Sequence, residues 1–535
     1  MHTTRAFRAL TVAAGAAVLA ACTLGDPDGE GAAPAAGAAG GESAEHTFVA
    51  GTGTVPHLNP QIIVSPSIDM VTGGMYEALV RLTDTYEVVP WLARDWEIAD
   101  GGRRVTLTLE EGVTWHDGEP FTADDVVFNL EELVPYQAYG AGLVESIDTV
   151  EAPDDHTVVM TFAEPYGPVM EVLSLQRMLP KHLYEGTDYL DNPANMAPVG
   201  TGPFEFENFA EGQEISMRAY EDYWKGEVEV DRLIYVIQND TNAGALSLIA
   251  GDTMVGGVGQ GMLEQVRAAE HLELTQRGQL PRQFIFTMNA DVPELQDPEV
   301  RRLVYQSVNR SQVAEVALPE ISYEPTSMYP DELGWIDPGI DYREEFPYDP
   351  DAINARLDEL GYGRDENGNR FSLRLHLMSM TAEARAVGAV IESSMAEVGI
   401  AVELVGEETN VFMENVYQRR DFDTAIVEAT LGVDPSLGIT RWYHCLSEPV
   451  DAENPSGICD EQLQEAVDAA LQTTDQAERA EHFRTVQERA AEVMMAGPLV
   501  FHTPFSAYNS AEWEGLGSPD GLTGGADWTA VSPRE

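Results

Sequence analysis

The residue types that most often carry chemistry in proteins are present in this sequence, but their spacing does not fit the common reactive sites. Eleven histidines are scattered along 535 residues, and none lies in the HExxH spacing that places two imidazoles around zinc. No GxSxG turn presents a serine nucleophile, and no Walker or GxGxxG loop is present to hold phosphate. The glycine-rich residues 256–262 are interpreted as a loop. A hydrolase is therefore the weaker hypothesis, and we expect no catalytic residue, metal site or cofactor.

Cys22 is the first of three cysteines, and it ends an apolar run that follows Arg5 and Arg8. A basic start, a short apolar stretch and small residues at its end are typical of a secretory signal, and the run is too short to span a bilayer. Residues 19–22 (LAAC) resemble a bacterial lipobox. This implies that residues 1–21 are a lipoprotein signal peptide and that Cys22 is lipidated. An ordinary signal peptide with an incidental cysteine is the alternative.

Cys445 and Cys459 then remain as a pair in an exported, oxidising environment. The segment between them is polar and rich in turn residues, so we predict a disulfide that stabilises the fold by ~3 kcal/mol through the unfolded state. A zinc site is disfavoured because only His444 lies close to Cys445. Two buried free thiols are the alternative.

Residues 22–45 consist almost entirely of Gly, Ala, Pro and acidic residues, so we expect a flexible tether. The formal net charge of −61 argues against nucleic acid or anionic lipid as a partner. We therefore expect the protein to contact the membrane through its lipid anchor only, on the outer face of the cell membrane.

Periodicity beyond residue 46 predicts interleaved strands and helices. Val105, Leu107 and Leu109 alternate with polar residues, which indicates a half-buried strand. Thr122 and Asp125 have capping-box spacing and predict the start of a helix. Further helices are expected at residues 298–310 and 350–362, and further strands at residues 155–162, 231–238 and 370–379. The fold class is therefore α/β.

Five blocks in this order resemble the bacterial extracellular solute-binding proteins of family 5, which serve peptide, nickel and related ABC importers. The blocks are residues 92–133, 200–240 (beginning GTGPFEF and including YEDYWKG), 297–310, 348–362 and 371–404. The resemblance implies a two-lobed periplasmic-binding-protein fold of type II, similar to cluster C, with an extra domain inserted in lobe one. Lobe one is expected at residues 46–285 with the extra domain at about 80–198, lobe two at 286–498, and a return to lobe one at 499–535.

The segment at residues 427–445 (VEATLGVDPSLGITRWYHC) holds most of the candidate ligand-binding residues. Oligopeptide- and dipeptide-binding members of the family carry an aspartate four residues before the proline of this block, where it neutralises the peptide's ammonium group. Leu431 occupies that position here, although Glu428 or Asp434 offers a substitute carboxylate. Because a buried unpaired ammonium is costly, Leu431 favours an uncharged solute or a blocked peptide.

Aromatic and basic residues complete the candidate site. Trp442, Tyr443 and Phe284 offer flat apolar walls, with core packing as the alternative. Arg282 offers a partner for a ligand carboxylate, with a surface ion pair as the alternative.

The sequence thus predicts a monomeric, lipid-anchored receptor that captures a peptide or peptide-like solute and delivers it to ABC permease subunits. A receptor for an oligosaccharide, a metal chelate or another neutral solute is one alternative. A sensory receptor of the same fold is another.

Overall fold

The computed structural model describes residues 46–62, 65–137, 139–276, 281–336, 339–378, 382–516 and 526–534. The signal peptide, Cys22 and the tether lie outside these ranges, so their expected roles stay predictions. No helix in the described ranges is long and apolar enough to cross a bilayer.

A seven-stranded sheet forms the base of lobe one, with the strand order β12-β19-β11-β1-β10-β9-β8. The first strand of the described chain lies near its middle and runs parallel to both neighbours, β10 and β11. The strands are β1 (Thr47–Thr52), β8 (Phe204–Ala210), β9 (Glu214–Ala219), β10 (Arg232–Ile237), β11 (Val255–Val258), β12 (Leu272–Thr275) and β19 (Phe505–Asn509). The helices of this lobe are α1 (Pro66–Thr72), α5 (Lys181–Tyr184), α6 (Thr241–Ala250) and α7 (Leu263–Arg267), and two short strands near the C-terminus are β20 (Trp513–Glu514) and β21 (Ser532–Pro533).

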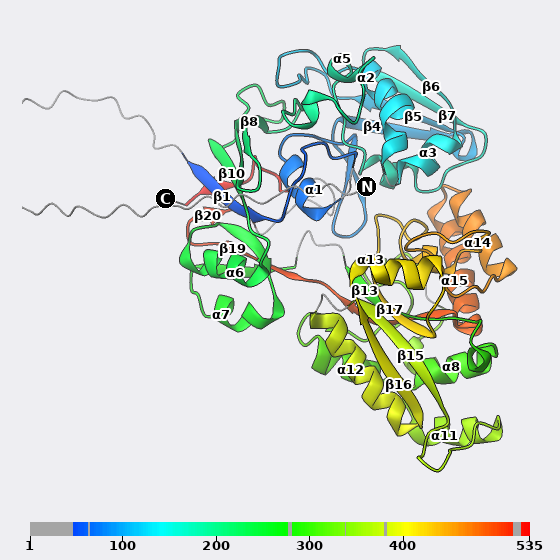
Figure 1. Ribbon diagram of the computed structural model, residues 1–535. Helices are drawn as coiled ribbons and strands as arrows, with labels where there is room; N and C mark the ends of the chain where they lie inside the picture. Colours follow the sequence, from blue (N-terminus) through cyan, green and yellow to red (C-terminus); the bar gives the residue numbers. More distant parts are fainter. Residues whose placement is uncertain are drawn as a thin grey trace, which may run out of the picture. The chain divides into compact units, whose positions relative to one another are not determined.

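The insertion in lobe one contains a four-stranded antiparallel sheet in the order β4-β5-β7-β6 (Figure 1). Val105, Leu107 and Leu109 are fully buried on one face of β5, which confirms the predicted alternation. The predicted capping box is also present, because the Asp125 carboxylate accepts from the Thr122 backbone N–H at 3.0 Å. The elements are β2 (Val80–Leu82), β3 (Val88–Pro90), β4 (Ala93–Ala99), β5 (Arg104–Leu109), β6 (Ile147–Asp154), β7 (Thr157–Phe162), α2 (Ala123–Phe128), α3 (Gly140–Ser146) and α4 (Val169–Leu173).

Lobe two is built on a six-stranded mixed sheet in the order β14-β18-β13-β17-β15-β16. Helix α12 packs along β15 and β16, while α14 and α15 pack against each other (Figure 1). The strands are β13 (Arg282–Met288), β14 (Ser322–Tyr323), β15 (Phe371–Met378), β16 (Ile400–Glu407), β17 (Thr424–Thr430) and β18 (Ala496–His502). The helices are α8 (Pro298–Gln306), α9 (Arg310–Gln312), α10 (Tyr342–Glu345), α11 (Pro350–Glu359), α12 (Ala382–Glu397), α13 (Thr409–Met413), α14 (Glu461–Leu471) and α15 (Gln476–Val493).

The chain passes between the two large sheets twice. The first passage leads from the end of β12 at Thr275 to the start of β13 at Arg282, and the second joins β18 to β19 through residues 503–504. The predicted lobe boundaries at residues 285/286 and 498/499 fall inside β13 and β18, and both of these strands belong to the lobe-two sheet. Two short connections of this kind are typical of a hinge between lobes.

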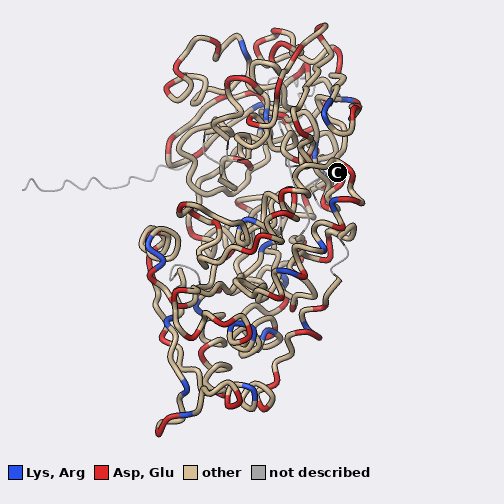
Figure 2. Tube along the Cα trace, turned by 90° about the vertical axis from the view of Figure 1, so that its right-hand side faces the viewer, with Lys and Arg blue, Asp and Glu red and all other residues tan. Residues whose placement is uncertain are grey.

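Acidic residues are distributed along the whole of the described part of the chain. Figure 2 shows the Asp and Glu positions spread along the drawn trace, with fewer Lys and Arg positions between them. This agrees with 91 acidic against 30 basic residues in the sequence.

Candidate functional site

A cavity of about 150 Å³ is bounded by the inserted domain on one side and by lobe two on the other. Tyr86, Trp96 and Glu171 line it from the inserted domain. Trp335, Asp434 and Arg479 line it from lobe two. Three aromatic rings, two carboxylates and one guanidinium therefore face a space large enough for a small solute or for one end of a larger one.

Asp434 is held in place by the turn that follows β17. Gly432 adopts φ 74°, a left-handed conformation that glycine accepts without strain and that reverses the chain after the strand. The Asp434 carboxylate accepts from the backbone N–H of Ser436 at 2.9 Å and from Nη2 of Arg479 at 2.8 Å. Since both Asp434 and Arg479 are buried, this ion pair neutralises most of the charge on the lobe-two wall.

Arg479 is oriented by a second contact. It lies in the first turn of α15, and its Nε donates to the carbonyl of Ala470 in α14 at 3.0 Å. The pKa of Arg479 is raised because attraction to Asp434 and Glu171 outweighs the effect of burial. Arg479 is therefore a fixed cation already committed to Asp434.

Glu171 lies in the short helix α4 and is the second carboxylate of the cavity. Its electrostatic neighbours are Asp434, which repels its negative charge, and Arg479, which attracts it. Burial is the largest effect, followed by repulsion from Asp434, and together they raise the pKa of Glu171 to about 7. Within the described ranges, its carboxylate forms no ion pair or hydrogen bond with another side chain.

The two walls also touch through the backbone. The N–H of Gly167 donates to the carbonyl of Leu471 at 2.6 Å. A Cβ at position 167 would lie 2.7 Å from the carbonyl oxygens of both Ala470 and Thr473. Glycine is thus required here because any side chain would push the inserted domain away from α14.

Three of the predicted ligand-binding residues form a separate group on β13 and β17. Arg282 Nη1 lies 3.2 Å from Glu428 Oε1, and His502 Nε2 lies 3.4 Å from the same oxygen. Phe284 is buried and stacks on His502 with ring centroids 5.1 Å apart. Hydrogen bonds and charge attraction from His502 and Arg282 outweigh burial, so the pKa of Glu428 is lowered. This group lies where both crossings leave the lobe-two sheet, and it does not line the cavity.

The other predicted residues occupy the interior of lobe two. Leu431, Trp442 and Tyr443 are each at most 3% exposed and belong to its main core. The Tyr443 hydroxyl donates to the carbonyl of Ala496 at 3.2 Å. Of the seven candidates, only Asp434 lines the cavity.

The disulfide between Cys445 and Cys459 is present, with Cα atoms 4.7 Å apart. The backbone N–H of Cys445 donates to Oε1 of Gln464 at 2.8 Å, which ties the bridged segment to α14. No group of three or more His, Cys, Asp or Glu side chains in the described part of the chain is arranged to hold a metal ion.

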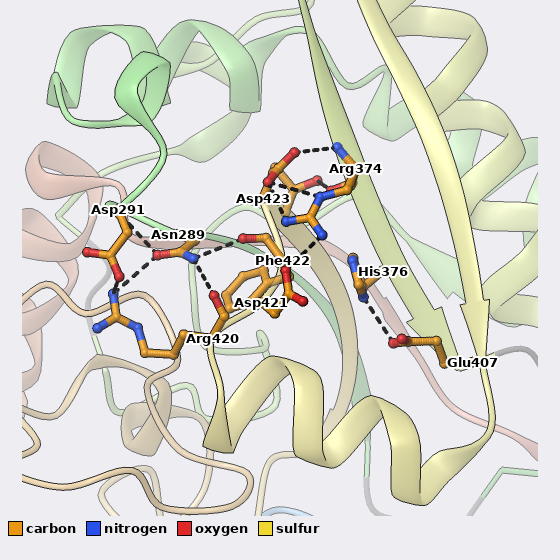
Figure 3. Close-up of polar contacts among 10 residues, drawn as sticks. Asn289, Asp291, Arg374, His376, Glu407, Arg420, Asp421, Phe422 and Asp423 are labelled. Carbon is orange, nitrogen blue, oxygen red and sulfur yellow. Dashed lines mark hydrogen bonds and ion pairs between the residues drawn. The ribbon is translucent and has the colours of Figure 1, made fainter.

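A polar cluster shown in Figure 3 fixes the start of β17, the strand that leads to Asp434. Asp423 accepts from the backbone N–H of Arg374 at 2.8 Å and from its Nη2 at 3.0 Å. Asn289 donates to the carbonyls of Arg420 and Phe422, both at 2.9 Å. The cluster thereby joins the strands β13, β15 and β17 at one point.

A second contact in the same view joins β15 to β16, the strand at one edge of the sheet. His376 Nδ1 lies 3.0 Å from Oε2 of Glu407, and both side chains are buried between β15 and β16 (Figure 3). These contacts supply partners for most of the polar atoms drawn, which is a structural role. The exception is Nε2 of His376, which is buried without a hydrogen-bond partner among the described residues.

Sequence reasoning did not anticipate the carboxylate that joins lobe one to the start of its insertion. Glu77 is buried and accepts from Trp91 Nε1 at 2.7 Å and from Tyr223 at 2.8 Å. It also accepts from Thr201 and Trp224, both at 2.9 Å. Three of these donors, Thr201, Tyr223 and Trp224, come from the two most recognisable motifs of the chain, residues 201–204 and 220–226. The polar side chains of both motifs were therefore the signal that they share a buried acceptor.

The glycines of the first motif have a packing role. A Cβ at Gly200 would lie 1.9 Å from the carbonyl oxygen of Met75, and one at Gly202 would lie 2.7 Å from that of Gly74. The segment therefore approaches the backbone before Glu77 as closely as only glycine allows.

Comparison with known proteins gives a consistent pattern. A sequence model described as "Bacterial extracellular solute-binding proteins, family 5 Middle" matches residues 87–447. The dipeptide-binding protein of Escherichia coli (strain K12) is 24% identical over 483 residues, which cover 84% of this chain and 88% of that protein. Among solved structures, the ABC transporter substrate-binding protein CtaP of Listeria monocytogenes has a TM-score of 0.79 at 21% identity, covering 92% of this chain and 100% of that one. NikA of Brucella suis, solved in complex with Fe(III)-EDTA, has a TM-score of 0.79 at 20% identity, covering 91% of this chain and 100% of that one.

Proposed function

Because the chain belongs to the bacterial extracellular solute-binding proteins of family 5, we propose that it is the substrate-binding lipoprotein of an ABC importer. It captures a peptide or peptide-like solute between its two lobes and delivers the solute to the permease. It acts as a monomer tethered by lipidated Cys22 to the outer face of the cell membrane.

One observation carries this proposal beyond family membership: the cavity has one wall in each lobe. A solute that contacts both walls stabilises the state in which they meet, so binding and closure are coupled. The chain passes between the two large sheets only at the β12–β13 and β18–β19 connections, and two such connections suit the hinge that this movement requires.

The first experiment identifies the solute. The full chain is purified without denaturation, and whatever co-purifies is released with acid and identified by mass spectrometry. The compound is then titrated back by calorimetry into protein that has been stripped of it. Stoichiometric rebinding of a peptide supports the proposal, whereas catalytic conversion of the compound by the protein contradicts it.

The second experiment tests the anchor. Replacing Cys22 with Ser removes the thiol that is expected to carry diacylglycerol. We expect the variant to leave the membrane fraction and to lose labelling by radioactive fatty acid. A variant that still partitions into detergent as the parent does would show that the anchor lies elsewhere.

A further inference from the structure

The cavity between the inserted domain and lobe two has an uncompensated negative charge. Glu171 and Asp434 contribute two carboxylates, and Arg479 contributes one cation. Because Asp434 is paired with Arg479 at 2.8 Å, the carboxylate of Glu171 forms no ion pair of its own within the described ranges, although the charge of Arg479 attracts it. A carboxylate in such a place is stable only if a cation lies beside it or if it takes up a proton and becomes neutral.

The rest of the lining favours a cation. Trp96, Trp335 and Tyr86 line the same space. The faces of aromatic rings attract cations through their quadrupole, most strongly where water is excluded. Arg479 already uses this effect, since its guanidinium carbon lies 5.7 Å from the Trp335 ring centroid.

The same cavity offers little to an anion. Its guanidinium is held by the Asp434 carboxylate through Nη2 and by the Ala470 carbonyl through Nε. An anionic group would also lie close to two carboxylates. A neutral solute would leave Glu171 to be neutralised by a proton alone.

We infer that Glu171 is the counter-ion for an ammonium group of the ligand, and that Trp96 and Trp335 flank that group. The inference rests on the proposed function and specifies its ligand class: a solute with one positive charge at the end that enters this cavity. It replaces the expectation of an uncharged ligand drawn from Leu431, because Leu431 is in the core of lobe two and does not line the cavity. The carboxylate comes from the opposite wall, in the inserted domain.

The test compares two solutes that differ in one charge. L-alanyl-L-alanine amide carries a free ammonium group and no carboxylate, and its N-acetyl form is neutral. We expect calorimetry on the full chain to give at least about tenfold tighter binding of the charged amide. Glu171→Gln should abolish that preference, Glu171→Asp should restore part of it, and Glu185→Gln, at an exposed site in the same domain, should leave it unchanged.

Proton release provides a readout that a structural role would not affect. The groups facing Glu171 are Asp434 and Arg479 from lobe two and Tyr166 and Tyr86 from its own side. Among them, Glu171 has a pKa of about 7, so an arriving ammonium should expel about half a proton at pH 7. The binding enthalpy should therefore differ between phosphate and Tris buffers for the parent protein and not for Glu171→Gln.

Equal binding of both amides, binding of neither, or an unchanged preference in Glu171→Gln would overturn the inference. These outcomes are distinct from failure of the proposed function. A neutral solute that co-purifies and rebinds would uphold solute capture and overturn the ammonium site. A protein that binds the charged amide through Glu171 but serves no importer would uphold the ammonium site and overturn the proposed role in import.

Discussion

Glu77, which lies just before the insertion in lobe one, and Glu171, which lies within it, are two carboxylates in contrasting environments. Glu77 accepts from four side-chain donors and lies beside Arg81, whose guanidinium carbon is 3.3 Å from the Trp91 ring centroid. Glu171 faces a cavity, and no side chain of the described ranges donates to its carboxylate. A carboxylate whose hydrogen bonds are supplied by its own protein has a structural role. A carboxylate that faces a cavity and lacks such partners indicates a site for a ligand.

Replacing Glu77 with Ala should lower the free energy of unfolding by about 3–5 kcal/mol. The substitution leaves two indole N–H groups and two hydroxyls without their acceptor, and it leaves buried Arg81 without its nearest negative charge. Urea denaturation followed by tryptophan fluorescence measures the effect. Glu221→Ala, at an exposed site in the segment that carries Tyr223, serves as the control. Equal stability of the two variants would contradict the organising role of Glu77.

Replacing Glu171 with Gln should change how stability depends on pH. Burial and Asp434 raise the pKa of Glu171 from 4.5 to about 7, so the folded state binds this proton more tightly than the unfolded state. The parent protein therefore loses up to about 3 kcal/mol as the pH rises from about 4.5 to about 7, and the uncharged variant does not.

Urea midpoints at four pH values across that window provide the measurement. We expect parent and Glu171→Gln to agree at the acidic end and the variant to be more stable at pH 8. Parallel curves for the two proteins would show that Glu171 ionises as an ordinary surface carboxylate does.

At the scale of the element, the disulfide holds the segment between η9 (Ile439–Tyr443) and α14. The two bridged cysteines are separated by 14 positions in the sequence, so the disulfide closes a short loop. Replacing both Cys445 and Cys459 with Ser should lower the free energy of unfolding by ~3 kcal/mol, mainly because the unfolded chain gains freedom. Non-reducing peptide mapping should recover the two cysteines in one linked peptide, and two alkylatable thiols would contradict the bridge.

The elements themselves were largely predictable from the sequence. Leu373, Leu375 and Leu377 alternate along β15 and are buried, as the period of a strand requires. Asp297 and Asp349 cap α8 and α11 with side-chain hydrogen bonds, and each is followed by proline at the first helical position. Such signals are local, and local patterns decide where elements begin and end.

The cavity was not predictable in the same way, because its walls come from five segments that are distant in the sequence. Asp434 was identified because its own neighbourhood resembles that of a known family. Glu171 lies in PVMEVLSL, an apolar run that indicates core packing, and a single acid in such a run was the one available clue. Whether that acid is paired depends on Arg479, 308 residues later, and no local pattern encodes this distance.

At the scale of the whole molecule, the contact at Gly167 determines whether the two walls can meet. Gly167→Ala places a Cβ 2.7 Å from the carbonyl oxygens of Ala470 and Thr473, so the inserted domain must move away from α14. We expect the radius of gyration measured by small-angle scattering to rise and affinity for the ligand to fall at least about tenfold.

Gly257→Ala is the matched control, because a Cβ there meets no atom within 4 Å. If both variants bind and scatter as the parent does, closure of this contact does not take part in binding.

The order of strands in the two sheets has a consequence for how the chain matures. Every strand of the lobe-two sheet lies between Arg282 and His502, so this sheet is complete once that stretch has left the ribosome. In the other sheet, Thr47 pairs with Arg232, and β19 fills the gap between β12 and β11 only near the end of translation. Phe48 then receives its last neighbours, Trp513 and Trp528. Pairings so distant in sequence form slowly. Lobe one is therefore the late-folding part, and a nascent chain of which only residues up to 504 have emerged holds a finished lobe two beside a sheet that still lacks β19, the second strand from its edge.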